Sequence, residues 1–168
     1  MNISSITHVF FDWGDTVMID DPAVTTSMLE WEVVQRVPGI EAVLTLLRTN
    51  GKTIVLATSA AVSDEGQIRL ALARVGLDSF FDKIYCFKNT GLSKGQEFYE
   101  YLFKDMQLLP SQALMVGDSF EKDVLSANKA GIAAIWFNEK TNENKRAPLY
   151  ITAPSMKELA NIFATGNG

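Results

Sequence analysis

The stretch Val9–Thr16 is the feature that most constrains the fold of this sequence. Three apolar residues lead directly into Asp12, which is followed by Trp13, Gly14 and Asp15. A short run of β-branched and aromatic residues predicts a buried strand, and Asp12 stands at its carboxyl end, where open α/β sheets hold their ligands. A carboxylate in this position can be a nucleophile, a metal ligand or only a turn residue. The stretch alone leaves the role of Asp12 open.

Similar apolar runs alternate with helical patterns along the rest of the chain. We predict strands at about 6–11, 53–57, 81–86, 113–116 and 133–137, with a short further strand at 149–151. Helices are expected at about 40–50, 64–75, 96–106, 122–130 and 155–163, followed by a tail at 165–168. Strands that alternate with helices are typical of a parallel sheet covered on both faces. We therefore expect an α/β fold, a three-layer, doubly wound parallel sheet of about five strands.

The length of the chain fits one domain. It has 168 residues, 47% of them hydrophobic, which is enough to bury a core. No composition shift or linker divides it, so we expect a single domain over residues 1–168. Residues 17–37 form a short insert after the first strand, in which Met28, Trp31 and Val34 are expected on one face of a helix.

Charge and cysteine content exclude several classes of function. The net charge is −5, and no block of lysines or arginines indicates a nucleic-acid or membrane surface. The single Cys86 cannot form an internal disulfide, which favours a reducing compartment. No signal-peptide pattern and no apolar run of membrane-spanning length is present, so a cytoplasmic protein is expected.

Two of the predicted strands end in a carboxylate. Asp12 follows the first strand, and Asp118 follows the strand at 113–116. If these strands are neighbours in a parallel sheet, the two carboxylates face one another, which is costly unless a positive charge neutralises them. Mg²⁺ would do so, because it prefers hard oxygen ligands. Asp123 could join them from the next helix, whereas the simpler alternative for Asp118-Ser119 is a turn and a helix cap.

Hydroxyl and ammonium groups follow other strands. Thr58 and Ser59 end the strand at 53–57, where hydroxyl and backbone N–H groups can hold a phosphate oxygen. Lys94, just before the helix at 96–106, could reach the same crevice and offset negative charge. Each feature alone is an ordinary helix-preceding cluster or surface lysine. The order Asp, Thr, Lys, Asp indicates a phosphate site more strongly than any one of them.

These four stretches together resemble the haloacid dehalogenase-like hydrolases, most of which are Mg²⁺-dependent phosphatases. The family's first motif, an apolar run followed by Asp-x-Asp-x-Thr, falls on Phe10–Thr16 with a departure at Gly14. Its second motif falls on Thr58 and its lysine on Lys94. Its last motif, Gly-Asp-x-x-x-x-Asp, falls on Gly117–Asp123 and is the most specific of the four. The resemblance extends from Val9 to about Phe163.

The resemblance implies a Rossmann-like core and a chemistry. Asp12 would be the nucleophile that forms an aspartyl-phosphate, Thr58 and Lys94 would hold the transferring phosphoryl group, and Mg²⁺ would be held by Asp12, Asp118 and the Gly14 carbonyl. The short insert stands where many members carry a whole cap domain. An open crevice suits an exposed phosphate on a larger substrate. It also suits a phosphorylated small molecule if a second copy of the chain closes the site, so a homo-oligomer is one of the expected alternatives.

Gly14 is the departure that matters for catalysis. The family's phosphatases carry an aspartate there as general acid/base, and in this chain the nearest aspartate is Asp15, one residue later. Asp15 is the first candidate to replace it, and Asp20 or Asp21 is less favoured. Without a proton donor, esters with good leaving groups, such as aryl phosphates, should be preferred over alkyl phosphates. The alternative is a catalytically weak module that binds phosphate or metal and regulates.

Overall fold

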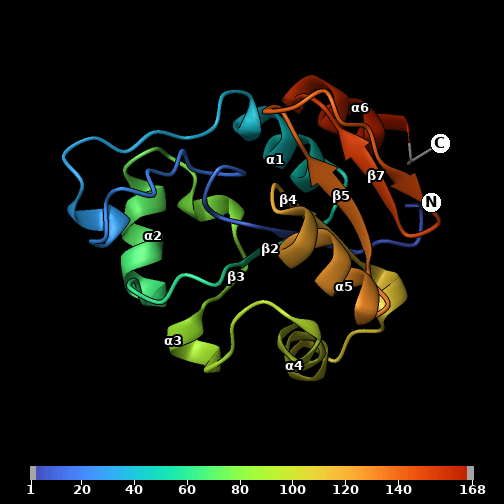
Figure 1. The fold of residues 1–168 in the computed structure, drawn as a ribbon, viewed down its shortest axis with the longest axis horizontal. Helices are drawn as coiled ribbons and strands as arrows, with labels where there is room; N and C mark the ends of the chain where they lie inside the picture. The colour runs from blue at the N-terminus through green and yellow to red at the C-terminus, as the bar shows by residue number, and fades with distance from the viewer. Residues whose placement is uncertain (1–2, 166–168) are drawn as a thin grey trace.

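A seven-stranded sheet forms the centre of the protein in the computed structural model, which describes residues 3–165 (Figure 1). Its spatial order is β3-β2-β1-β4-β5-β7-β6. All neighbouring pairs are parallel except β6 and β7, which are antiparallel. The strands are β1 (His8–Phe11), β2 (Thr53–Ala57), β3 (Lys83–Tyr85), β4 (Ala113–Gly117), β5 (Ala133–Phe137), β6 (Arg146–Ala147) and β7 (Tyr150–Ala153).

Alternate residues of each strand pack on opposite faces of this sheet. Val9 and Phe11 of β1 pack in one apolar cluster, and Phe10 between them packs in another. The first cluster includes buried residues of α1 (Ile40–Thr49), α2 (Glu65–Ala73) and α6 (Met156–Thr165), and the second those of α4 (Gln96–Met106) and α5 (Ser126–Lys129). Figure 1 shows α1 and α6 on one side of the sheet and α4 on the other. The predicted three-layer α/β fold is therefore confirmed, with seven strands instead of about five.

Local signals set the ends of several helices. An Asp64–Gln67 capping box begins α2. The Ser155 hydroxyl accepts a hydrogen bond from the Glu158 N–H at 3.1 Å at the start of α6. After α1 the chain turns at Gly51, whose φ of 67° lies in the left-handed region that favours glycine. These boundaries agree with the sequence-based predictions to within one or two residues.

The insert is not helical over most of its length, and this prediction was wrong. It contains only one 3₁₀ turn, Met28–Glu30 (η1). Its two ends pair with each other instead, because the Ile19 N–H donates to the Gln35 carbonyl and the Val37 N–H to the Val17 carbonyl, both at 2.9 Å. Backbone groups used in this way are not available for a helix.

Other segments also differ from their predictions. A short helix, α3 (Phe87–Thr90), lies where no helix was predicted, and a π-helix, Phe120–Leu125 (η4), precedes α5 in place of one helix. In α4 the buried face includes Tyr99 and Phe103, while Tyr101 is 39% exposed.

Two remaining points concern the surface and the end of the chain. Strand β6 (Arg146–Ala147) begins at the end of the polar stretch 139–146, where no strand was predicted. Apart from Thr165, the predicted tail lies outside the described residues. Within residues 3–165 no helix is long and apolar enough to cross a membrane.

Candidate functional site

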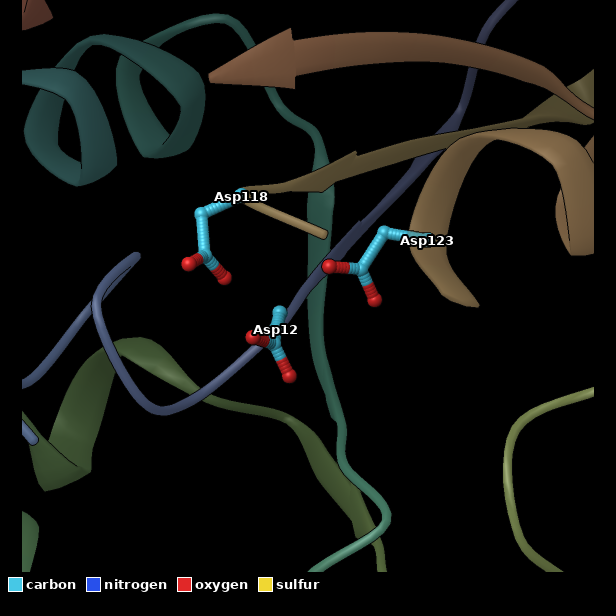
Figure 2. Close-up of side chains that lie close together, drawn as sticks. All are labelled: Asp12, Asp118 and Asp123. Carbon is cyan, nitrogen blue, oxygen red and sulfur yellow. The ribbon is translucent and has the colours of Figure 1, made fainter. Parts of the chain in front are cut away.

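The carboxyl ends of β1 and β4 place two aspartates side by side. Phe11 is the register partner of Val116, and the Asp12 N–H donates to the Val116 carbonyl at 2.9 Å. Figure 2 shows the carboxylates of Asp12, Asp118 and Asp123 turned toward a common space. Each of the three carboxylates has an oxygen that lies within 4.8 Å of an oxygen of both others. The structure thus brings together the three carboxylates that the sequence placed at one sheet edge.

The Lys94 ammonium lies between two of these carboxylates. It contacts Asp12 Oδ1 and donates to Asp123 Oδ1 at 2.6 Å, and its side chain is only 3% exposed. Burial acts to lower the pKa of Lys94, but the charges of Asp12 and Asp123 outweigh it and raise the pKa above its ordinary value. The Lys94 N–H also donates to Ser59 Oγ at 2.8 Å. Lys94 is therefore a fixed positive charge in the site.

Gly117 makes room for Asp123. A Cβ atom at position 117 would lie 2.2 Å from Asp123 Oδ2 and 2.6 Å from Asp123 Cβ, so no larger residue fits without moving the carboxylate. Asp123 Oδ2 also accepts the Ser119 N–H at 2.9 Å. The Gly-Asp-x-x-x-x-Asp spacing thus has a steric reason, because the first residue must leave space for the last.

The acidic cluster carries more negative charge than its lysine offsets. Burial, with the charges of Asp12 and Asp123, raises the pKa of Asp118 to about 7. Burial also raises the pKa of Asp123 to about 6, against the lowering effect of Lys94. Lys140 approaches Asp118 only to 3.9 Å and is mostly exposed. A set of hard oxygen donors with excess negative charge fits a divalent cation such as Mg²⁺.

The loop after β2 supplies hydroxyl groups beside the cluster. Thr58 is 5% exposed, and its hydroxyl oxygen accepts the Ala60 N–H at 3.0 Å. Ser59 Oγ accepts the Lys94 N–H. In both cases the hydroxyl oxygen is the acceptor, so the O–H proton can still be donated to a ligand.

A crevice of about 350 Å³ opens in front of these groups. The insert forms one of its walls, through Val24, Thr26, Met28 and Trp31, and Lys122 lies on its lining. Trp31, which was expected on a helix face, packs against the edge of the core. It is half-buried, lines the crevice and donates its indole N–H to the Thr26 carbonyl at 3.3 Å. Apart from Trp31, no residue of the insert indicated from the sequence that this segment would form a wall of the crevice.

Asp15 is held by a residue that the sequence did not single out. Its φ is 57°, and its Oδ2 contacts the Lys140 ammonium at 2.5 Å. Its Oδ1 accepts the Asp20 N–H at 3.1 Å. The hydrogen bond to Asp15 raises the pKa of Lys140. Lys140 lies in the stretch 139–146, where charge alone gave no indication of a partner more than one hundred residues away.

Asp20 comes close to Gly14. A Cβ atom at position 14 would lie 3.1 Å from both Asp20 Cβ and Asp20 Oδ2. Desolvation raises the pKa of Asp20, and the charges of Asp15 and Asp12 add to this, against the lowering effect of the Asp21 N–H. Asp20, Asp15 and Gly14 all line the crevice.

Comparison with known protein families agrees with this arrangement. Residues 6–137 match the model of a family described as haloacid dehalogenase-like hydrolase. Among curated proteins, the pyrimidine 5'-nucleotidase YjjG of Escherichia coli is 26% identical over 92% of this chain and 69% of its own length. A glyceraldehyde 3-phosphate phosphatase of Methanothermobacter thermautotrophicus is 23% identical over 84% of this chain. The chain spans only 62% of the length of that phosphatase.

Solved structures share the fold. An uncharacterized protein from Listeria monocytogenes superposes with a TM-score of 0.80 and 24% identity, covering 96% of this chain and 98% of that one. A HAD phosphatase from Thermococcus onnurineus superposes with a TM-score of 0.74 and 19% identity, covering 94% of this chain and 97% of that one. The magnesium-bound YfnB of Bacillus subtilis superposes with a TM-score of 0.74 and 18% identity, covering 94% of this chain and 98% of that one. At these identities the likeness concerns the fold.

Proposed function

The chain belongs to the haloacid dehalogenase-like hydrolases, and from this membership and the geometry of its site we propose that it is a Mg²⁺-dependent phosphatase. It hydrolyses phosphate monoesters through an aspartyl-phosphate on Asp12. The observation that supports this most is the convergence of Asp12, Asp118 and Asp123 around the buried Lys94 ammonium. The relatives named as phosphatase and nucleotidase support the same class of reaction.

Asp12 has the position that a nucleophile needs. Its side chain is 14% exposed, at the inner end of the crevice, and Lys94 contacts one of its oxygens. A carboxylate that is fixed in this way loses little freedom when it attacks a bound phosphoryl group. Lys94 and the hydroxyl groups of Thr58 and Ser59 are placed to hold the phosphoryl oxygens.

Mg²⁺ fits the carboxylates of this site. Asp12 and Asp118 would hold it, together with the Gly14 carbonyl, and Asp123 would support them from the side that Lys94 occupies. When bound, the ion would offset charge on the phosphoryl oxygens. The magnesium-bound state of YfnB, which shares the fold, supports this choice of metal.

The crevice favours a phosphorylated small molecule over an exposed phosphate on a larger substrate. A volume of about 350 Å³ is at the small end of the range for ligand pockets. The insert adds an apolar wall with Trp31 and Met28, against which the organic part of an ester can pack. The substrates named for the relatives, a nucleotide and a triose phosphate, are of this size class.

Phosphate release with and without Mg²⁺ tests the proposal. The wild-type chain should release inorganic phosphate from p-nitrophenyl phosphate only with the metal, and Asp12→Asn should abolish release while leaving the fold intact by circular dichroism. If the folded wild type releases no phosphate from any monoester in a metabolite panel, the proposed function is wrong and the alternative, a binding or regulatory module, takes its place.

A further inference from the structure

The crevice contains more carboxyl groups than the nucleophile and the metal site require. Five aspartates line it, and no glutamate or histidine does so within the described residues. Three of them form the acidic cluster, and two of these three pair with Lys94. Asp15 and Asp20 remain as groups that could donate a proton to a leaving alcohol, a transfer that an alkyl ester needs.

Asp15 has no oxygen left for this task. Its Oδ2 pairs with Lys140 at 2.5 Å, and its Oδ1 accepts the Asp20 N–H. Both oxygens are therefore occupied by donors of the protein itself. The contact through Oδ1 fixes the backbone at position 20. Asp15 therefore acts in this structure as a residue that positions Asp20.

Asp20 lies beside the open space at Gly14. A Cβ atom at position 14 would lie 3.1 Å from Asp20 Oδ2, so the Asp20 carboxyl borders the place where a side chain would begin. The backbone of Gly14 does not lie in the left-handed region, so conformation alone does not require glycine there. The contact with Asp20 is the closer constraint, because a Cβ atom at position 14 would require the Asp20 side chain to shift by a few tenths of an ångström.

A tight turn brings Asp20 to this place. The Val17 and Met18 N–H groups both donate to the Trp13 carbonyl, and Gly14 pairs with Met18 in a β-bridge. The Asp21 N–H donates to Asp20 Oδ1 at 3.0 Å. Among residues 3–165, Asp20 Oδ2 has no hydrogen-bond partner, and this is the oxygen beside Gly14.

We propose that Asp20, supplied by the insert, is the proton donor and acceptor of the phosphatase reaction in place of a residue at position 14. The inference rests on the proposed function. As Asp12 attacks phosphorus and the ester P–O bond breaks, the Asp20 carboxyl gives its proton to the leaving oxygen. In the second step water attacks the phosphorus of the aspartyl-phosphate, its proton passes to the Asp20 carboxylate, and inorganic phosphate and free Asp12 result.

This proposal reverses the substrate preference expected from Gly14 alone. With Asp20 as donor, the wild type should turn over alkyl phosphates well. Asp20→Asn keeps the acceptor for the Asp21 N–H but cannot donate a proton to the ester oxygen. It should lower kcat for an alkyl ester such as glycerol 2-phosphate by about 10²–10⁴-fold. Release of p-nitrophenol from p-nitrophenyl phosphate in the first turnover should fall far less, because this leaving group needs little protonation and the second step, shared by both esters, follows its release.

An exchange variant tests the position directly. Asp20→Gly removes both the carboxyl and the Cβ atom that would crowd position 14. Adding Gly14→Asp to it should restore much of the alkyl-phosphate rate that Asp20→Gly alone loses. Asp21→Asn is the matched control, because Asp21 is exposed and its side chain caps only the Ala23 N–H, and it should leave both rates unchanged.

Four results would overturn the proposal. The first is an Asp20→Asn variant that lowers neither rate, or that lowers release of both leaving groups equally in the first turnover, which indicates a role in binding or folding. The second is selective loss of alkyl turnover in Asp15→Asn but not in Asp20→Asn, which assigns the proton transfer to Asp15. The third is an exchange variant that shows no recovery although it unfolds at the temperature of the wild type. If the wild type lacks Mg²⁺-dependent turnover of the aryl ester, the proposed function itself has failed and this inference falls with it.

Discussion

At the scale of single residues, Gly117 controls the position of Asp123. An added Cβ would lie 2.2–2.6 Å from three atoms of the Asp123 side chain, so the carboxylate would have to leave Lys94. We expect Gly117→Ala to lower the free energy of unfolding by about 3–5 kcal/mol, the usual cost of breaking a buried ion pair. Denaturant unfolding monitored by tryptophan fluorescence measures this.

Gly66→Ala provides the control for that variant. Gly66 lies in α2, and its Cβ would meet only the Asp64 carboxylate at an ordinary 3.4 Å. Alanine favours helix over glycine, so stability should stay the same or rise by up to about 1 kcal/mol. A Gly117→Ala variant as stable as the wild type would show that Asp123 can leave Lys94 at little cost.

The sequence allowed some residues of the site to be predicted and not others. Asp12, Asp118 and Thr58 follow apolar strands, and a parallel sheet brings strand ends to one edge. The approach of Asp20 to Gly14 and of Lys140 to Asp15 depends on turns and on the path of a long loop. No periodicity or spacing in the sequence encodes such contacts.

At the scale of elements, Arg74 holds the insert against α2. Its guanidinium donates to three carbonyls of the insert, those of Leu29, Trp31 and Glu32, at 3.1, 2.6 and 2.9 Å. Arg74→Ala should therefore speed amide hydrogen exchange at 24–36 and raise KM for a small monoester, because this segment forms a wall of the crevice. Hydrogen exchange measured by mass spectrometry, together with steady-state kinetics, checks both effects.

Arg69→Ala, within α2, is the matched control. Arg69 pairs with Glu65 and Asp78 and donates to the Phe81 carbonyl, and among residues 3–165 it makes no hydrogen bond to the insert. It should leave exchange at 24–36 unchanged. Equal exchange in both variants would mean that the insert is held by other contacts, such as the Ser27–Ser63 hydroxyl pair at 2.8 Å.

Elements with local end signals were predictable, and those formed by distant pairing were not. The capping residues of α2 and α6 stand in the sequence beside the helices that they begin. The ends of the insert pair with each other across sixteen to twenty residues, which removes the helix that its apolar spacing indicated. Strand β6 is only two residues long, an arginine and an alanine, so the pattern gave no sign of it.

At the scale of the whole molecule, the acidic cluster should make stability depend on pH and metal together. The raised pKa values of about 7 for Asp118 and about 6 for Asp123 mean that the metal-free fold binds protons more tightly than the unfolded chain. Their stabilising contribution is complete below about pH 4, the unfolded value, and is lost as pH rises through about 6 and 7.

The proposed Mg²⁺ would bind the ionised carboxylates of the folded state and should replace the lost stabilisation. The increase in melting temperature on adding millimolar Mg²⁺ should therefore be small near pH 5 and larger near pH 8. Asp118→Asn should remove most of the increase. A shift that is equal at both pH values, or one that survives Asp118→Asn, would contradict binding at this cluster.

Covalent labelling in the first turnover tests the central claim most directly. Wild-type protein mixed with a ³²P-labelled monoester and Mg²⁺, then quenched in acid within one turnover, should carry label on the peptide that contains Asp12. Hydroxylamine should release the label, as expected for an acyl phosphate, and Asp12→Asn should carry none. Phosphate release by an Asp12→Asn variant at the wild-type rate, with no label on either protein, would contradict the account.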